Sequence, residues 1–285
     1  MTVTYNHDLA TARFTAIIRT IFRWKGGVWK SVYLEVIAWC TIYGVLSAIY
    51  RCWLSEHERE VFEEVVSVCN KYTDFVPLTF MLGYYVTLVV SRWWHVIQNI
   101  GFTDNIALLV ANYIQGKDER SIKYKKTIVR YICLLQTMVY RTISVPVRTR
   151  YPTLESLVDA GYLEPNEVEI ISEDNMWLPY HWALGLINLA RDEGVIKSDH
   201  AVQQIFKACM DFRSSQISLW IYNWIPVPLV YTQVVFITVR LYFILAILGR
   251  QFTDKDNFPI DIYVPVLTIL QLVFYVGWLK VSSIF

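Results

Sequence analysis

Four long stretches of this chain carry almost no charged residues, and this property restricts the fold more than any other feature. A helix needs about 20 mostly apolar residues to cross the hydrocarbon core of a membrane. The stretches that reach or approach this length are residues 31–50, 75–91, 215–249 and 262–280. Of all residues, 55% are hydrophobic and 18% are charged, whereas soluble domains average about 25% charged residues. We therefore expect an all-α polytopic membrane protein with four transmembrane helices.

The charges that flank these stretches predict the orientation of the chain. Cytoplasmic segments next to membrane-spanning helices carry an excess of Lys and Arg. Within residues 1–30, Asp8 is the single acidic residue, and it is opposed by the basic residues Arg13, Arg19, Arg23, Lys25 and Lys30. We expect residues 1–30 to be cytoplasmic, and four crossings then place both termini and residues 92–213 on that side.

Residues 92–213 contain more than half of the charged residues of the chain. Apolar residues recur there at helical spacing, at Ile128, Ile132, Leu135 and Val139. Such a pattern is typical of an amphipathic helix with one buried face. We therefore expect this part of the chain to form a folded, helical cytoplasmic region.

Charge is also distributed unevenly along that region. Residues 117–150 are strongly basic, and residues 155–174 are wholly acidic. A basic patch can bind nucleic acid. Inside a polytopic membrane protein, however, lipid headgroups or ion pairs between subunits explain it better. We expect no nucleic-acid partner, and one domain over residues 1–285.

The sequence lacks the residue patterns of common enzymes. It has no Gly-rich dinucleotide-binding motif, no P-loop, no HExxH zinc motif and no GxSxG nucleophile motif. The five cysteines include no CxxC pair, and none of the five histidines has a partner at metal-ligand spacing. We therefore expect a protein that is not an enzyme.

The stretch 75–91 contains three residues at every fourth position: Val76, Phe80 and Tyr84. Residues at this spacing share one face of a helix. The face could pack against other helices, or it could line a pore as a hydrophobic constriction that closes by dewetting. No ring of acidic residues interrupts the apolar stretches, so a cation path has little support. Helix N-termini and backbone amides facing the path would favour an anion instead.

Five segments of the chain form a specific pattern when they are taken together. They are YVTLVVSRWW (85–94), GKDE (116–119), IPVPLVYTQVV (225–235), GRQF (249–252) and DIYVPVLTILQLVFYVGWLKV (261–281). With the opening MTVTY and the following Ala-Thr-Ala-Arg, these segments resemble the bestrophins, and most of all the animal bestrophins. The resemblance covers essentially the whole chain.

The resemblance implies a homopentamer with one central pore that conducts chloride and other small anions and is activated by cytosolic calcium. The hydrophobic neck of the family falls on Val76, Phe80 and Tyr84, where relatives usually carry an aliphatic residue and two Phe. The cytoplasmic constriction, called the aperture, falls near His200. The resemblance also implies a multi-pass protein in the lipid bilayer of the cell membrane.

The calcium clasp of the family is the part in which this sequence departs most from the family pattern. In relatives the clasp combines the backbone carbonyl at the position of Ala10 with acidic residues after the last span. Calcium takes roughly six to eight oxygen ligands, largely from carboxylates. This sequence ends at Phe285 without an acidic run, so we expect a C-terminally truncated form in which the rest of the clasp is absent from the chain. The alternative function is a non-conducting or modulatory subunit that forms hetero-oligomers with related bestrophins.

Overall fold

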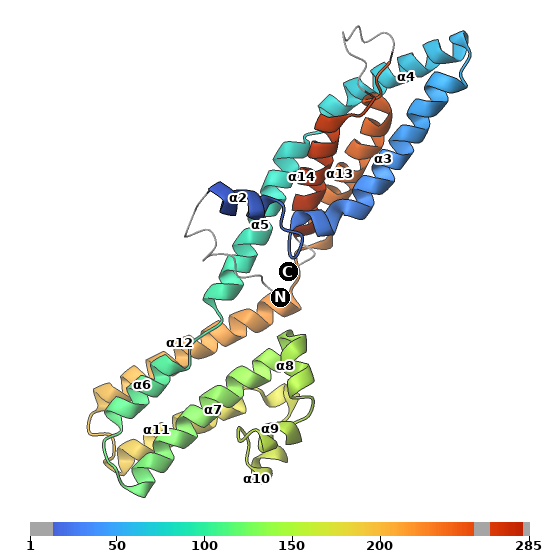
Figure 1. Ribbon diagram of the computed structural model, residues 1–285. Helices are drawn as coiled ribbons and strands as arrows, with labels where there is room; N and C mark the ends of the chain where they lie inside the picture. Colours follow the sequence, from blue (N-terminus) through green and yellow to red (C-terminus); the bar gives the residue numbers. More distant parts are fainter. Residues whose placement is uncertain (1–13, 254–262, 282–285) are drawn as a thin grey trace. The chain divides into compact units, whose positions relative to one another are not determined.

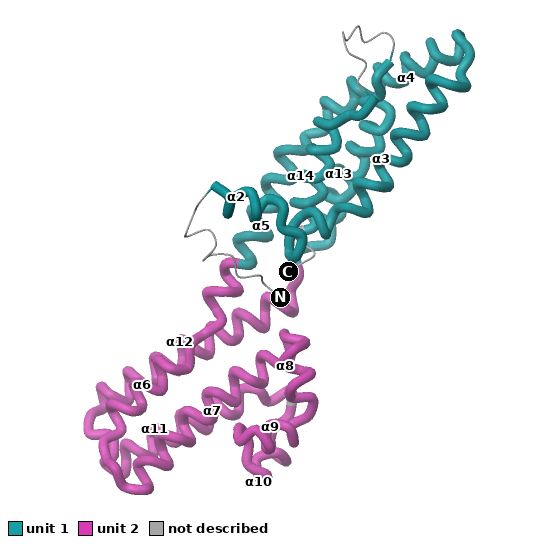
Figure 2. The backbone as a smooth tube through the Cα atoms, in the orientation of Figure 1, with its two compact units in different colours: residues 1–93, 227–285 teal, residues 94–226 magenta. Residues whose placement is uncertain are grey.

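The computed structural model describes residues 14–253 and 263–281. These residues form α-helices and one short 3-10 helix, and none of them lies in a β-strand (Figure 1). The all-α expectation is therefore confirmed for the described part of the chain. The chain divides into two compact units, which Figure 2 colours separately. Unit 1 comprises Met1–Trp93 and Val227–Phe285, and unit 2 comprises Trp94–Pro226.

Long apolar helices make up most of unit 1. Leu82, Val239 and Leu279 are fully buried in its core. The helices Glu56–Phe75 and Leu229–Gly249 approach each other closely, since a Cβ atom at Gly249 would lie 2.7 Å from the backbone nitrogen of Asn70. The helices are α2 (Phe14–Ile21), α3 (Val28–Cys52), α4 (Glu56–Phe75), α5 (Leu78–Gln98, which continues into unit 2), α13 (Leu229–Gly249) and α14 (Val266–Val281).

Two helices of unit 1, α3 and α13, are long and apolar enough to cross a membrane by themselves. The pair formed by α4 and α5 passes the same test together, although the two helices meet at a bend of 42°. The apolar part of α14, Val266–Lys280, is shorter. By length and composition the described residues therefore provide two candidate spans, or three if the bent pair is one span.

Prolines end the helices within two of the apolar stretches. Proline lacks the backbone donor that a helix needs, and it disfavours helical geometry in the residue before it. Val76 precedes Pro77 and is extended, with φ −79° and ψ 113°, so α4 ends there and α5 begins at Leu78. In the same way Ile225 lies between α12 and α13 with φ −104° and ψ 95°. The stretch 215–249 thus contains the end of one helix and the whole of the next.

Unit 2 is a helical body with an apolar core. The face of α7 predicted from the spacing is buried, because Ile128, Ile132, Leu135 and Val139 all belong to this core. That expectation is confirmed. The helices are α6 (Asp104–Tyr113), α7 (Glu119–Ile143), α8 (Val145–Arg150), α9 (Glu155–Asp159), α10 (Pro165–Val168), η1 (Glu173–Asn175), α11 (Leu178–Asp192) and α12 (Asp199–Trp224).

A polar cluster holds the turn that connects α5 to α6 within unit 2. The carbonyl oxygen of Ile100 accepts three hydrogen bonds, from the Tyr140 hydroxyl at 2.6 Å, the Gln216 amide at 3.1 Å and the Gln136 amide at 3.2 Å. Gly101 adopts φ +73° there, and a Cβ atom at this position would lie 2.6 Å from the Gln216 amide. The turn is therefore fixed to both α7 and α12.

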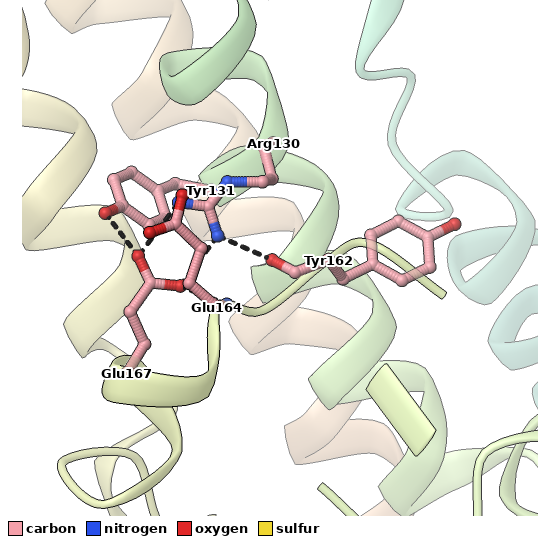
Figure 3. A network of polar contacts seen from close by, with 5 residues as sticks. All are labelled: Arg130, Tyr131, Tyr162, Glu164 and Glu167. Atoms are coloured by element: carbon pink, nitrogen blue, oxygen red, sulfur yellow. Dashed lines mark hydrogen bonds and ion pairs between the residues drawn. The ribbon is translucent and has the colours of Figure 1, made fainter. Parts of the chain in front are cut away.

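A second polar cluster attaches the short helix α10 to α7 (Figure 3). Arg130 donates two hydrogen bonds to the Glu167 carboxylate, at 2.6 and 2.8 Å, and the Tyr131 hydroxyl donates a third at 2.7 Å. Burial would raise the pKa of Glu167, but these bonds outweigh it and hold the pKa below its usual value. Burial and the bond to Glu167 raise the pKa of Tyr131 to about 12, so the phenol remains a donor. One member of the basic segment is thus paired with the acidic segment of its own chain.

Replacing Glu167 with Gln should destabilise the segment that contains α10. The change removes the charge that compensates the mostly buried Arg130 guanidinium and weakens its charged hydrogen bonds, and we expect a loss of about 2 kcal/mol. Hydrogen exchange on the full chain should then show amides of residues 163–171 exchanging roughly thirtyfold faster. Glu164→Gln is the matched control, because Glu164 lies 3.6 Å from Arg130 but its side chain is 60% exposed. Its exchange should change little.

Acid should act through the same carboxyl group. The pKa of Glu167 is lower in the folded protein than in the unfolded chain. Its stabilising contribution is therefore complete above about pH 4.5 and is lost as the pH falls through the folded-state pKa. After correction for intrinsic exchange rates, acidification below about pH 4 should accelerate exchange of residues 163–171 in the wild type more than in Glu167→Gln. Equal acid sensitivity of the two proteins would contradict this assignment.

Candidate pore-lining site

One side of α5 presents large apolar side chains that the rest of the described chain leaves mostly exposed. Phe80 is 76% exposed and Tyr84 is 55% exposed. They lie one helical turn apart and therefore share a face. Leu78, Leu82 and Tyr85 point into the core of unit 1 instead. The helix is thus anchored by one face and leaves a second apolar face free for another surface.

A groove of about 410 Å³ lies beside this face, between α5 and α13. The Tyr231 ring of α13 lies next to Tyr84, with 6.4 Å between the ring centroids. The other lining side chains are apolar: Phe80, Met81, Val230, Val234 and Val235. The two phenol hydroxyls are therefore the strong hydrogen-bonding groups among the lining side chains.

Val76 does not lie on α5 with the other two residues of the expected neck. It follows the last residue of α4, in an extended conformation. Its side chain is partly buried and packs against the core of unit 1. The structure thus brings Phe80 and Tyr84 together on one helical face and places Val76 at the break before that helix. The prediction that all three residues share one helical face assumed a continuous helix, and Pro77 prevents that continuity.

His200 is the second residue of α12, in unit 2, and its side chain is exposed. Its Nε2 atom lies 3.4 Å from the Gln204 amide nitrogen. The turn before it is fixed by Arg191, whose Nε donates to Asp199 at 2.6 Å and whose Nη1 donates to the Ile196 carbonyl at 3.1 Å. The bond from Arg191 lowers the pKa of Asp199. Asp199 is therefore ionised next to His200 at neutral pH.

The calcium site expected from the resemblance has no counterpart in the part of the chain that the structure describes. Ala10 lies outside the described residues. Among residues 14–253 and 263–281, no group of three or more His, Cys, Asp or Glu side chains is arranged to hold a metal ion. Calcium needs several oxygen ligands, so the described helices alone do not form this site.

Sequence reasoning missed a charged cluster that connects three helices of unit 1. Glu35 of α3 pairs with Arg240 of α13, and Lys280 of α14 lies 2.7 Å from the other carboxylate oxygen. Lys280 also donates to the Ser31 carbonyl. The signal was present in the sequence, because a charge within an apolar stretch needs a partner, and these stretches contain opposite charges. Tyr231 was also missed, since no spacing rule relates it to Tyr84.

The sequence matches one family over its whole length. A family model described as "Bestrophin, RFP-TM, chloride channel" matches residues 1–285. Bestrophin homolog 24 of Caenorhabditis elegans is 38% identical over 292 residues, which cover 99% of this chain and 46% of that protein. Bestrophin homolog 5 of the same organism is 38% identical over 287 residues, with 98% and 63% covered. The chain therefore spans less than two thirds of the length of either relative.

Solved structures also resemble this chain. A bacterial bestrophin homolog from Klebsiella pneumoniae, carrying a point mutation, aligns with a TM-score of 0.57 at 13% identity. The alignment covers 89% of this chain and 88% of the bacterial one. At this identity the likeness shows the fold alone, which is a bestrophin fold. Because the family model covers every residue and relatives share more than a third of their aligned residues with it, the chain belongs to the bestrophin family, a family of chloride channels.

Proposed function

We propose that this chain is a subunit of a chloride channel in which five copies surround one central pore. The exposed apolar face of α5, with Phe80 and Tyr84, is the observation that carries the proposal. In a ring each copy contributes this face once, and head-to-tail contacts between copies form a ring when the rotation between them closes. The chloride-channel description of the family supports an anion as the permeant ion.

The proposed topology has four crossings, by α3, by the α4 and α5 pair, by α13 and by α14. The 16 residues of α14 extend about 24 Å, which is less than the roughly 30 Å of the hydrocarbon core. Residues 263–265, directly before α14, therefore contribute to that crossing in the proposed topology. Both termini and residues 92–213 are cytoplasmic, and the membrane is the cell membrane. The basic residues before α3 support this orientation.

The neck of the proposed pore consists of Val76, Phe80 and Tyr84. A narrow apolar passage loses its water and so blocks ions without a plug. Tyr84 differs from the other two residues because its hydroxyl can donate a hydrogen bond to a passing anion. Val76 lies beside Pro77, where a missing backbone donor interrupts the helix. The start of α5 can therefore adjust more easily than its middle.

The proposal includes activation by calcium, which the family resemblance implies, with the backbone carbonyl of Ala10 as one calcium ligand. It also includes His200 as the residue of the cytoplasmic aperture. His200 lies in the first turn of α12, next to a turn that Arg191 holds through Asp199 and the Ile196 carbonyl. The charged groups nearest to it along the chain are Lys197 and Asp199.

Reconstitution of the purified chain in liposomes with a chloride-sensitive dye tests the function directly. We expect chloride entry that depends on the reconstituted protein. Absence of flux from a verified pentamer would overturn the proposal. If the silent chain also altered currents of a co-expressed bestrophin, the modulatory function would replace it.

Shortening the neck side chains should weaken the dewetting barrier. In the triple variant Val76→Ala, Phe80→Ala, Tyr84→Ala, chloride flux without calcium should rise roughly tenfold or more, because a wider passage stays hydrated. Val90→Ala is the matched control, since Val90 is also exposed on α5 but lies on another face. A triple variant whose flux equals that of the control in all conditions would contradict the neck assignment.

A permanent positive charge at position 200 should increase anion conductance, because one added cation per subunit attracts chloride. His200→Lys should therefore conduct chloride better than His200→Gln under the same conditions. Equal conductance of the two variants would show that position 200 does not line the anion path.

A further inference from the structure

We propose that α2 lies in the plane of the membrane and binds the surface of a leaflet that contains anionic phospholipids. The large apolar residues of this helix are Phe14, Ile17, Ile18 and Ile21, at positions i, i+3, i+4 and i+7. This spacing places all four on one face. Between 41% and 77% of each side chain is exposed, and no residue of α2 is buried.

Contacts within unit 1 fix this helix next to the first turns of α3. The Trp29 indole nitrogen donates to the Ile21 carbonyl at 2.7 Å. The Phe22 and Trp29 rings are stacked with 6.5 Å between their centroids, and Trp24 lies 5.6 Å from Tyr33. The end of α2 is therefore held where α3 starts.

The direction of α2 suits a membrane surface. Figure 1 shows α2 crosswise to the long helices α3, α13 and α14 of the same unit. A helix crosswise to a membrane span, at the end of that span, runs along the membrane plane. An apolar face at that depth enters the boundary between headgroups and acyl chains, as in other amphipathic interfacial helices. Tryptophan side chains such as Trp24 and Trp29 also favour this depth.

The charges around α2 identify the partner. Residues 14–34 contain no acidic residue. They contain Arg19 within α2 itself, followed by Arg23, Lys25 and Lys30. A basic amphipathic segment next to a membrane span is attracted to anionic headgroups. A second copy of the chain would have to supply an apolar and acidic surface, whereas a leaflet with anionic lipids supplies both properties at the required place.

Photocrosslinking in the reconstituted full chain tests the proposal, which rests on the proposed topology but not on anion conduction. The photoreactive residue p-benzoylphenylalanine replaces Ile18 on the apolar face or Thr15 outside it, in vesicles of phosphatidylcholine and phosphatidylserine. Mass spectrometry should find lipid adducts at position 18 and few at position 15. A probe at Ile37, which is exposed in the middle of α3, reports the topology independently.

The crosslinking products at positions 18 and 37 together decide whether the proposal holds. Lipid adducts at Ile37 and Ile18 support the proposal. Adducts at Ile37 with protein crosslinks or no product at Ile18 overturn it and leave the channel topology intact. An Ile37 probe that finds no lipid overturns the topology and this proposal with it.

Charge neutralisation tests the preference for anionic lipid. In the double variant Arg19→Gln, Lys25→Gln, the ratio of phosphatidylserine to phosphatidylcholine adducts at position 18 should fall roughly threefold or more, toward the bulk ratio. Lys123→Gln, Lys126→Gln is the matched control, because both lysines are exposed on α7 in unit 2. An unchanged adduct ratio in the α2 variant would overturn the headgroup preference.

Discussion

The arrangement of unit 1 depends on the ion pairs that the Glu35 carboxylate makes. It binds cations from two other helices, Arg240 of α13 and Lys280 of α14. Between lipid tails, apolar side chains alone give little preference for one helix register over another, because the tails are equally apolar. A charge in that environment needs its partner. Sliding or rotating any of the three helices would therefore separate an ion pair, and the apolar core around Leu82 and Val239 packs within this frame.

Proline residues decide where the helices in that frame end. Hydropathy treats residues 215–249 as one apolar stretch, yet Pro226 and Pro228 separate the end of α12, in unit 2, from α13, in unit 1. Pro77 has the same effect between α4 and α5, which meet at a bend of 42°. The bend gives α5 a direction of its own, so its Phe80 and Tyr84 face is oriented independently of the helix before it.

Regular local patterns were predictable from the sequence, and contacts between distant segments were not. The spacing of Ile128 and Ile132 identified the buried face of α7, because a helix repeats its faces over a few residues. The bond between Arg130 and Glu167 was not predictable, since several cations and several carboxylates in adjoining segments could have paired. Which of them pair depends on how the chain through α8, α9 and α10 folds back onto α7. Val76 shows a different limit of prediction. Pro77 was visible in the sequence, but the uniformly apolar stretch around it favoured one continuous helix, and the break that the proline causes was not predicted.

Two apolar surfaces of unit 1 differ in the charges beside them, and this difference separates their roles. Arg19 lies on α2 and Lys25 follows this helix in the sequence, with no acidic residue within residues 14–34. The groove between α5 and α13 has no charged side chain among its lining residues, and Tyr84 and Tyr231 supply hydroxyls there. Cations beside an apolar face hold anionic headgroups in place. A conduction path instead needs binding weak enough for the ion to leave, and hydroxyls on an apolar wall provide such weak binding. Under the two proposals, the same kind of apolar exposure therefore serves attachment at α2 and passage at α5.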